Sequence, residues 1–281
     1  MVGDPRRLGV ARALVGGRLL EGDVSIAAGV VEAVGLPVGR NPLGVAVPGF
    51  VDLQVNGFGG VQFIEAHADE MTATAEALGR AGVVHASPTL CSASVDRYRG
   101  ALEHLATAIA AEPNCGLLPA HREGPFLSTR FAGSHDTSTF REPDVGVLAD
   151  LCGAGPVGMI TLAPESDGAS GLIVEACSRG LLVSLGHTAA DADTCRAAAD
   201  IGARSITHCW NAHRRFGHRD PGPAGWAMDD PRCMVGLIAD GVHVAPEVLA
   251  LTFSATRGRV ALTTDAIAPA GTDVDRWRDV R

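Results

Sequence analysis

The sequence contains no lysine. All 23 of its basic residues are arginine, and 32 carboxylates outnumber them, which gives a net charge of −9 at neutral pH. A chain that is acidic overall and has no cluster of basic residues argues against nucleic acid as a partner. It does not argue against the binding of one phosphate group in one pocket. Aromatic residues make up only 4% of the chain, so the core must consist mainly of alanine, valine, leucine and isoleucine. That composition favours a parallel sheet wrapped by helices.

Several motifs are also missing. No long uncharged apolar segment is present, so we expect neither a signal peptide nor a membrane span. No Gly-x-Ser-x-Gly elbow, P-loop or Rossmann fingerprint occurs, which argues against a serine nucleophile and against nucleotide binding. The seven cysteines form no Cys-x-x-Cys pair, and their scattered, odd number predicts free thiols in a reducing, cytoplasmic compartment.

What the sequence does contain is a series of short apolar runs that end in ionisable residues. A buried strand reads as such a run. Ligand-type side chains at the ends of successive strands predict an α/β fold, a TIM-type (β/α)8 barrel with its active site at that face. The length of 281 residues suits this fold. The runs end in His121 and Glu123, in His187, in His208, in Asp240 and His243, and in Asp265.

We expect two domains. Residues 1–47 combine short apolar stretches with glycine turns, which predicts a small antiparallel β unit with hairpins. Pro48-Gly49 marks the boundary, and residues 48–281 form the barrel domain. Strands are expected at 50–55, 83–89, 116–120, 157–162, 181–185, 205–207, 234–238 and 260–264. Helices are expected at 69–81, 95–111, 145–152, 171–179, 191–201 and 246–255, with Asp191 as an N-cap.

Glu123, His187 and His208 form a candidate metal site. Two histidines and one glutamate are a common ligand set for catalytic zinc, which keeps a fourth position for water. Neighbouring barrel strands bring their ends together, so the three residues can converge. Taken singly, a glutamate such as Glu123 is more often an exposed turn carboxylate than a ligand, and each histidine is more often a hydrogen-bonded loop residue; the combination of the three favours a metal site.

The remaining polar residues leave two interpretations open. Asp265 is either a general base beside a metal-bound water or a structural cap of the segment that follows. His243 either donates a hydrogen bond to a polarised carbonyl or starts a helix before Pro246. The polar loop 211–219 carries arginines that face solvent or hold an anion such as phosphate.

Taken together and in order, these motifs resemble the N-acetylglucosamine-6-phosphate deacetylases of the amidohydrolase superfamily. The resemblance covers residues from about 10 to 275. It rests on the segments Pro48–Gly57, His121–Leu127, Gly133–His135, Leu162–Glu165, Gly186–Thr188, Thr207-His208 with Asn211-Ala212, Asp240–His243 and Thr264–Ala266.

The resemblance implies a role for each residue. It assigns Glu123, His187 and His208 to one divalent metal ion, with zinc as the expected metal, and Asp265 to acid-base chemistry. It assigns Ser134, His135, Asn211, Ala212, Arg219, Asp240 and His243 to the substrate, with Asn211, Ala212 and Arg219 toward its phosphate. Gln54 and Asn56 stand where many amidohydrolases have two metal-binding histidines, which implies the single-metal branch. A homodimer is also implied, because the phosphate-binding arginine can come from the partner.

The sequence departs from the family in two places. His213 stands where a methionine usually follows Asn-Ala, and family members continue well past Arg281. The small β-sandwich and the last barrel helix would then be incomplete, so we expect poor expression, aggregation and little activity. Three alternatives to the deacetylase follow: an impaired remnant that binds metal or sugar phosphate, a deacetylase for N-acetylgalactosamine 6-phosphate, and another amidohydrolase reaction.

Overall fold

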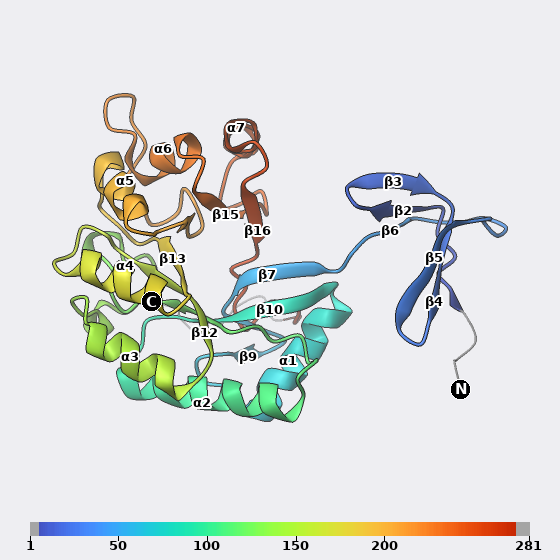
Figure 1. The fold of residues 1–281 in the computed structure, drawn as a ribbon, viewed down its shortest axis with the longest axis horizontal. Helices are drawn as coiled ribbons and strands as arrows, with labels where there is room; N and C mark the ends of the chain where they lie inside the picture. The colour runs from blue at the N-terminus through green and yellow to red at the C-terminus, as the bar shows by residue number, and fades with distance from the viewer. Residues whose placement is uncertain (1–5, 274–281) are drawn as a thin grey trace. The chain divides into compact units, whose positions relative to one another are not determined.

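The computed structural model describes residues 6–273, shown as a ribbon in Figure 1. The chain separates into two compact units at the junction between Phe50 and Val51. Residues 1–5 and 274–281, which include the outer ends of both expected domains, lie outside the described residues. No helix among the described residues has the length and apolar character needed to cross a membrane.

The first unit consists of short strands. The predicted hairpins are present: β2 pairs antiparallel with β3, and β4 with β5. The buried Asp23 carboxylate holds the unit together, since it accepts hydrogen bonds from the Val10 amide at 3.0 Å and the Arg7 guanidinium at 3.1 Å. The strands are β1 (Arg6–Arg7), β2 (Arg12–Val15), β3 (Arg18–Glu21), β4 (Asp23–Ala27), β5 (Val30–Leu36) and β6 (Val45–Ala46).

The second unit is built on an eight-stranded parallel sheet with the order β16-β15-β14-β13-β12-β11-β10-β7. The order follows the chain, as expected when each strand returns through a right-handed crossover. Its strands are β7 (Phe50–Val55), β10 (Val83–Leu90), β11 (Ala120–Glu123), β12 (Val157–Leu162), β13 (Leu182–Leu185), β14 (Ser205–Ile206), β15 (Met234–Ile238) and β16 (Val260–Thr263). A short hairpin, β8 (Gly57–Phe58) with β9 (Val61–Gln62), follows β7.

The first and last strands meet and close the sheet into a barrel. Beyond the end of β16, the Asp265 amide donates to the Gln54 carbonyl at 2.9 Å, and the Asn56 amide donates to the Ala266 carbonyl at 2.7 Å. The Asp52 side chain adds to this seam, since it accepts hydrogen bonds from the Thr263 hydroxyl at 2.9 Å and the Thr264 amide at 3.1 Å. The barrel predicted from the sequence is therefore confirmed.

Helices follow the strands and pack on the outside of the sheet (Figure 1). Asp191 caps the fifth helix as predicted, because its carboxylate accepts the Thr194 amide hydrogen at 2.8 Å. The helices are α1 (Ala68–Arg80), α2 (Val95–Ala111), α3 (Val145–Ala154), α4 (Ala169–Ser178), α5 (Ala192–Asp200), α6 (Gly222–Asp229) and α7 (Pro246–Thr256).

Two sequence-based predictions of elements were wrong in detail. The strand expected at 116–120 begins its regular ladder only at Ala120. The Leu118 amide already bonds to the Ala86 carbonyl, but Pro119 has no amide hydrogen and the register shifts between Ala120 and His121. Helix α6 was not predicted, because its sequence opens with glycine and proline and carries almost no polar face.

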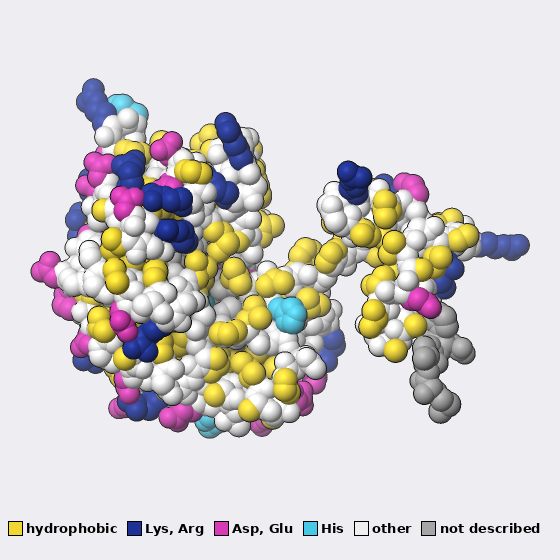
Figure 2. Space-filling model, in the orientation of Figure 1, with side chains coloured by type: hydrophobic (Ala, Val, Ile, Leu, Met, Phe, Trp, Pro, Cys, Tyr) yellow, Lys and Arg dark blue, Asp and Glu magenta, His cyan; other side chains and the backbone are white. Residues whose placement is uncertain are grey.

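Aliphatic side chains fill the space between strands and helices, as the composition predicted. Ile160 of β12 and Val183 of β13 are fully buried there. The outer faces of the two seam strands and their neighbour are different: Val51, Val84 and Leu262 are 51%, 46% and 55% exposed. Apolar side chains are visible over this part of the barrel in Figure 2, and most of the arginines and carboxylates on this face lie elsewhere.

Candidate metal centre and active site

Three of the predicted residues converge on one point at the carboxyl ends of the strands. Glu123 ends β11, His187 lies two residues beyond β13, and His208 lies two residues beyond β14. The Glu123 Oε1 atom lies 3.1 Å from His187 Nε2 and 2.9 Å from His208 Nε2, and the two Nε2 atoms are 3.1 Å apart. All three side chains are buried.

An unusual backbone conformation orients the side chains of this cluster. His187, His208 and Asp265 have positive φ angles of 49°, 31° and 52°. Residues other than glycine seldom adopt this left-handed region, which costs about 1–3 kcal/mol each and is found most often at functional sites. Each of these residues follows a strand closely, so the left-handed turn redirects the side chain from the line of the strand toward the centre of the barrel mouth.

The spacing of the three atoms suits a metal ion. Zinc bonds of about 2.0–2.1 Å in tetrahedral geometry place neighbouring ligand atoms about 3.3 Å apart, close to the separations found here. The Nδ1 atom of His187 lies 2.9 Å from the Phe131 carbonyl oxygen, to which it donates. With Nδ1 engaged in this way, Nε2 is the ring nitrogen that faces Glu123 and would bind a cation, as in histidine ligands oriented by a carbonyl.

His135 joins the group in a different way. Its Nε2 atom lies 3.7 Å from Glu123 Oε2, so Glu123, His135 and His187 also qualify by distance as a possible metal group. However, the Ser92 amide donates to His135 Nδ1 at 3.2 Å. A neutral ring that accepts at Nδ1 carries its proton on Nε2. His135 therefore presents a hydrogen-bond donor, whereas His187 and His208 are the better lone-pair donors.

The charges of the cluster are strongly coupled. Burial raises the pKa of the Glu123 carboxyl, but hydrogen bonds from His187 and His208 outweigh it and hold that pKa well below its usual range. Burial lowers the pKa of His208, but the hydrogen bond to Glu123 and the negative charges of Glu123 and Asp265 together outweigh burial and raise that pKa to about 9. Burial lowers the pKa of His135 to about 4. These shifts favour an ionised Glu123 carboxylate beside a protonated His208.

Asp265 lies beside the cluster with one oxygen held. Its Oδ1 atom accepts hydrogen bonds from Asn56 Nδ2 at 2.6 Å and from Gln54 Nε2 at 3.1 Å. Gln54 Nε2 also lies 3.2 Å from Glu123 Oε1, so it links the two carboxylates. Burial, with the nearby Glu123 charge, raises the pKa of Asp265 to about 6. A carboxyl with such a pKa can both accept and return a proton near neutral pH.

A cavity of about 460 Å³ opens over these residues, within the size range of small-molecule sites. Of the predicted substrate residues, Ser134 and His135 line it. No role was predicted for six further lining residues. Two of them, Cys91 and Ser92, lie just beyond the predicted strand 83–89, and that position was the signal that could have identified them. The six are Gln62, Glu65, Cys91, Ser92, Asp136 and Ile267.

The other predicted substrate residues lie outside that lining. Asn211 and Ala212 are half-buried, and Ala212 approaches Gly133 beside His187. Arg219 is exposed. Asp240 and His243 are exposed, and His243 Nδ1 donates a hydrogen bond to Asp240 Oδ2 at 2.8 Å.

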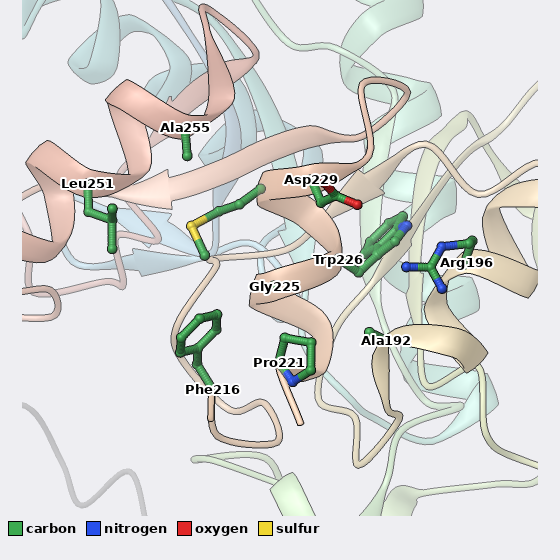
Figure 3. Close-up of a pocket in the computed structure, with 10 residues that line it drawn as sticks. Ala192, Arg196, Phe216, Pro221, Gly225, Trp226, Asp229, Leu251 and Ala255 are labelled. Carbon is green, nitrogen blue, oxygen red and sulfur yellow. The ribbon is translucent and has the colours of Figure 1, made fainter. Parts of the chain in front are cut away.

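A second hollow, of about 470 Å³, lies between α5, α6 and α7 (Figure 3). Phe216, Trp226 and Leu251 are among its mostly apolar lining, which includes no histidine or cysteine. Arg196, at its edge, is already paired with Asp193 at 2.5 Å. This hollow offers mainly apolar packing surface, with the carboxylate of Asp229 also in its lining.

The barrel and the convergent carboxylate and imidazoles define a class: (β/α)8-barrel proteins with a candidate metal centre at the carboxyl ends of the strands.

Comparison with known proteins identifies which members of this class the chain is similar to. No profile of a protein family matches the chain. The N-acetylglucosamine-6-phosphate deacetylase of Danio rerio is 35% identical over 239 residues, which cover 81% of this chain and 59% of the relative. The N-acetylgalactosamine-6-phosphate deacetylase of Escherichia coli O157:H7 is 31% identical and covers 93% of this chain and 71% of the relative.

Comparison with solved structures also finds deacetylases of N-acetylated sugar phosphates. The N-acetyl-D-glucosamine-6-phosphate deacetylase of Mycobacterium smegmatis superposes with a TM-score of 0.87 at 36% identity, over 97% of this chain and 74% of that one. A mutant of that enzyme has been solved in complex with N-acetyl-D-glucosamine-6-phosphate. The chain belongs to the N-acetylglucosamine-6-phosphate deacetylase family, as the sequence motifs predicted. It spans 59% of the length of the Danio rerio relative.

Proposed function

We propose that this protein hydrolyses the acetamide of N-acetylglucosamine 6-phosphate to glucosamine 6-phosphate and acetate. The observation that carries this proposal is the convergence of Glu123, His187 and His208 beside Asp265, in a chain 36% identical to a deacetylase of known structure. The reaction needs a polarised carbonyl, an activated water and a group that moves a proton, and the cavity offers residues for each.

Glu123, His187 and His208 would hold one divalent cation, and zinc suits a donor set of two imidazoles and one carboxylate. When bound, such a cation supplies a water of lowered pKa and polarises the carbonyl of the substrate. Gln54 and Asn56 already donate to Asp265, and amides are poor zinc ligands beside imidazole. We therefore propose a single cation.

Asp265 would take the proton from the attacking water and return it to the leaving amine. Its Oδ1 atom is held by two amides, while Oδ2 has no hydrogen-bond partner among residues 6–273. That leaves Oδ2 as the atom for proton transfer. Ser134 and His135 would orient the sugar from the wall of the cavity, and His243 with Asp240 would approach the carbonyl side.

Asn211, Ala212 and Arg219 would bind the phosphate. Arg219 is exposed and lies outside the lining of its own cavity, which supports the proposal that it serves the site of a second subunit in a homodimer. Seven free cysteines among the described residues suit a cytoplasmic location. We also propose that residues 1–47 are part of a small β-sandwich, separate from the barrel domain 48–281.

The proposal is tested by measuring acetate release from N-acetylglucosamine 6-phosphate before and after removal of metal and its restoration with zinc. Glu123→Gln should abolish both metal binding and activity, whereas Asp193→Asn, on the exposed face of α5, should leave both unchanged. Activity that survives a chelator would contradict the metal-dependent reading. A higher kcat/KM with N-acetylgalactosamine 6-phosphate would transfer the assignment to that isomer.

The phosphate contact has its own test. Arg219→Ala should raise KM for the phosphorylated sugar about ten-fold or more, in keeping with a charge-assisted hydrogen bond, and hardly change the rate with unphosphorylated N-acetylglucosamine. Mixed dimers, in which one subunit carries Arg219→Ala and the other carries Glu123→Gln, show which subunit supplies the arginine. Equal effects on both substrates would remove Arg219 from the phosphate site.

A further inference from the structure

The Asn56 side chain lies between two groups that require opposite ends of its amide. On one side, Asn56 Nδ2 donates to Asp265 Oδ1 at 2.6 Å. On the other side, Cys91 Sγ lies 2.9 Å from Asn56 Oδ1 and donates its hydrogen to it. A carboxylate only accepts hydrogen bonds, and a thiol is a donor with little capacity to accept. The order thiol, amide oxygen, amide nitrogen, carboxylate is therefore the only one in which both contacts are made.

Cys91 is placed to hold that order. It directly follows β10 and lines the cavity with Asn56 and Asp265. Burial, together with the charges of Glu123 and Asp265, raises the pKa of the Cys91 thiol well above its ordinary value, so the hydrogen is present to be donated. An apolar residue at this position would leave the Asn56 oxygen without that partner.

We propose that Cys91 is a positioning residue that fixes the amide of Asn56 and, through it, the orientation of the Asp265 carboxylate. The contact between Cys91 and Asn56 stands on geometry alone, whereas its effect on turnover rests on the proposed function. The two parts need separate measurements.

Infrared spectroscopy tests the contact without any activity. The S–H stretching band that disappears in Cys91→Ala belongs to this thiol among the seven. In the wild-type protein we expect that band at the low frequency of a hydrogen-bonded thiol, and in Asn56→Ala at the higher frequency of a free one. The carboxylate band that disappears in Asp265→Asn should also shift in Cys91→Ala. An S–H band unaffected by Asn56→Ala would overturn the proposal even if the protein proved inactive.

Kinetics test the consequence. Loss of one net hydrogen bond predicts a fall in kcat of about five-fold in Cys91→Ala, with KM and metal content retained. Cys91→Ser keeps a donor and should restore kcat to within about two-fold of wild type. Cys115→Ala, at a half-buried thiol remote from the cavity lining, is the matched control.

A double-mutant cycle decides whether Cys91 acts through Asn56. In an Asn56→Ala background, Cys91→Ala should change kcat by less than about two-fold, because the group it positions is gone. Additive effects, or a Cys91→Ser variant as slow as Cys91→Ala, would show that the thiol contributes packing and not orientation. An inactive wild-type protein would count against the proposed function and leave the infrared result to decide the contact.

Discussion

At the scale of single residues, His208 and Glu123 share a proton at the point where the proposed cation would bind. With a pKa of about 9, His208 is protonated at neutral pH, and its hydrogen lies between Nε2 and the ionised Glu123. A metal ion needs the deprotonated ring. We therefore predict that zinc affinity rises as pH increases toward about 9 and that close to one proton is released per ion bound. Calorimetry in buffers of different ionisation enthalpy measures the released proton, and a buffer-independent enthalpy would contradict the prediction.

Asp265 gives a second prediction at this scale. Asp265→Asn keeps the shape of the side chain and removes the proton acceptor, so kcat should fall by at least ~100-fold. Metal content should be unchanged, because the three proposed ligands stay in place. A variant that retains its full rate would assign proton transfer to another group, such as His135, which lines the same cavity.

The sequence allowed part of this site to be predicted. Glu123, His187 and His208 each end a recognisable apolar run, and parallel strands bring such ends together, so their convergence follows from the barrel. Cys91 and Ser92 also follow a strand, but a thiol and a hydroxyl carry no charge pattern that separates them from packing residues. The exposed pair of Asp240 and His243 depends on the path of a loop, which periodicity does not determine.

At the scale of elements, the seam between β7 and β16 depends on the buried Asp52. Its carboxylate accepts the Gln54 amide at 3.0 Å in addition to its two contacts with Thr263 and Thr264. Asp52→Ala leaves buried donors without partners, so we predict a loss of about 3 kcal/mol in the free energy of unfolding. Denaturant unfolding measures it. Asp150→Ala removes a half-exposed pair with Arg99 and should cost less than about 1 kcal/mol.

Most helices and strands could be predicted from the sequence, because the apolar residues of each recur with a clear period and the run of apolar residues has a clear end. Helix α2 and strands β7, β12 and β15 begin and end at the expected residues. The exceptions have local causes: Pro119 interrupts the ladder that leads into β11, and α6 is apolar on every side because it is covered on most of its surface. Periodicity fails for a helix without an exposed polar face.

At the scale of the whole molecule, hydrogen bonds run across the interior of the barrel. His121 Nε2 lies 2.7 Å from the Thr161 hydroxyl, and that hydroxyl lies 2.6 Å from the Thr207 hydroxyl. Burial lowers the pKa of His121 to about 4. At a pH between about 4 and about 6.5, His121 is therefore protonated in the unfolded chain and neutral in the folded protein.

The stability of the barrel should consequently fall with acidification. A histidine with a depressed folded pKa contributes stability above its unfolded pKa of about 6.5, and this contribution is lost as pH falls through about 4, for a total on the order of 3 kcal/mol. Unfolding of His121→Gln should depend less on pH over this interval than that of the wild-type protein. His218→Gln, at an exposed histidine, is the control. Identical pH dependence in all three proteins would place the acid sensitivity elsewhere.

The seam also bears on the order in which the chain folds. Gln54 and Asn56 are separated from Asp265 by 211 and 209 residues. They supply both the backbone bonds that close the barrel and the side-chain bonds that hold the Asp265 carboxylate. Contacts between such distant segments form late, because the intervening loop must first lose its entropy. During synthesis or refolding, burial of Trp226 in the helical layer can precede closure of the barrel, whereas assembly of the candidate site around Asp265 cannot. Recovery of activity would then time the final step of folding.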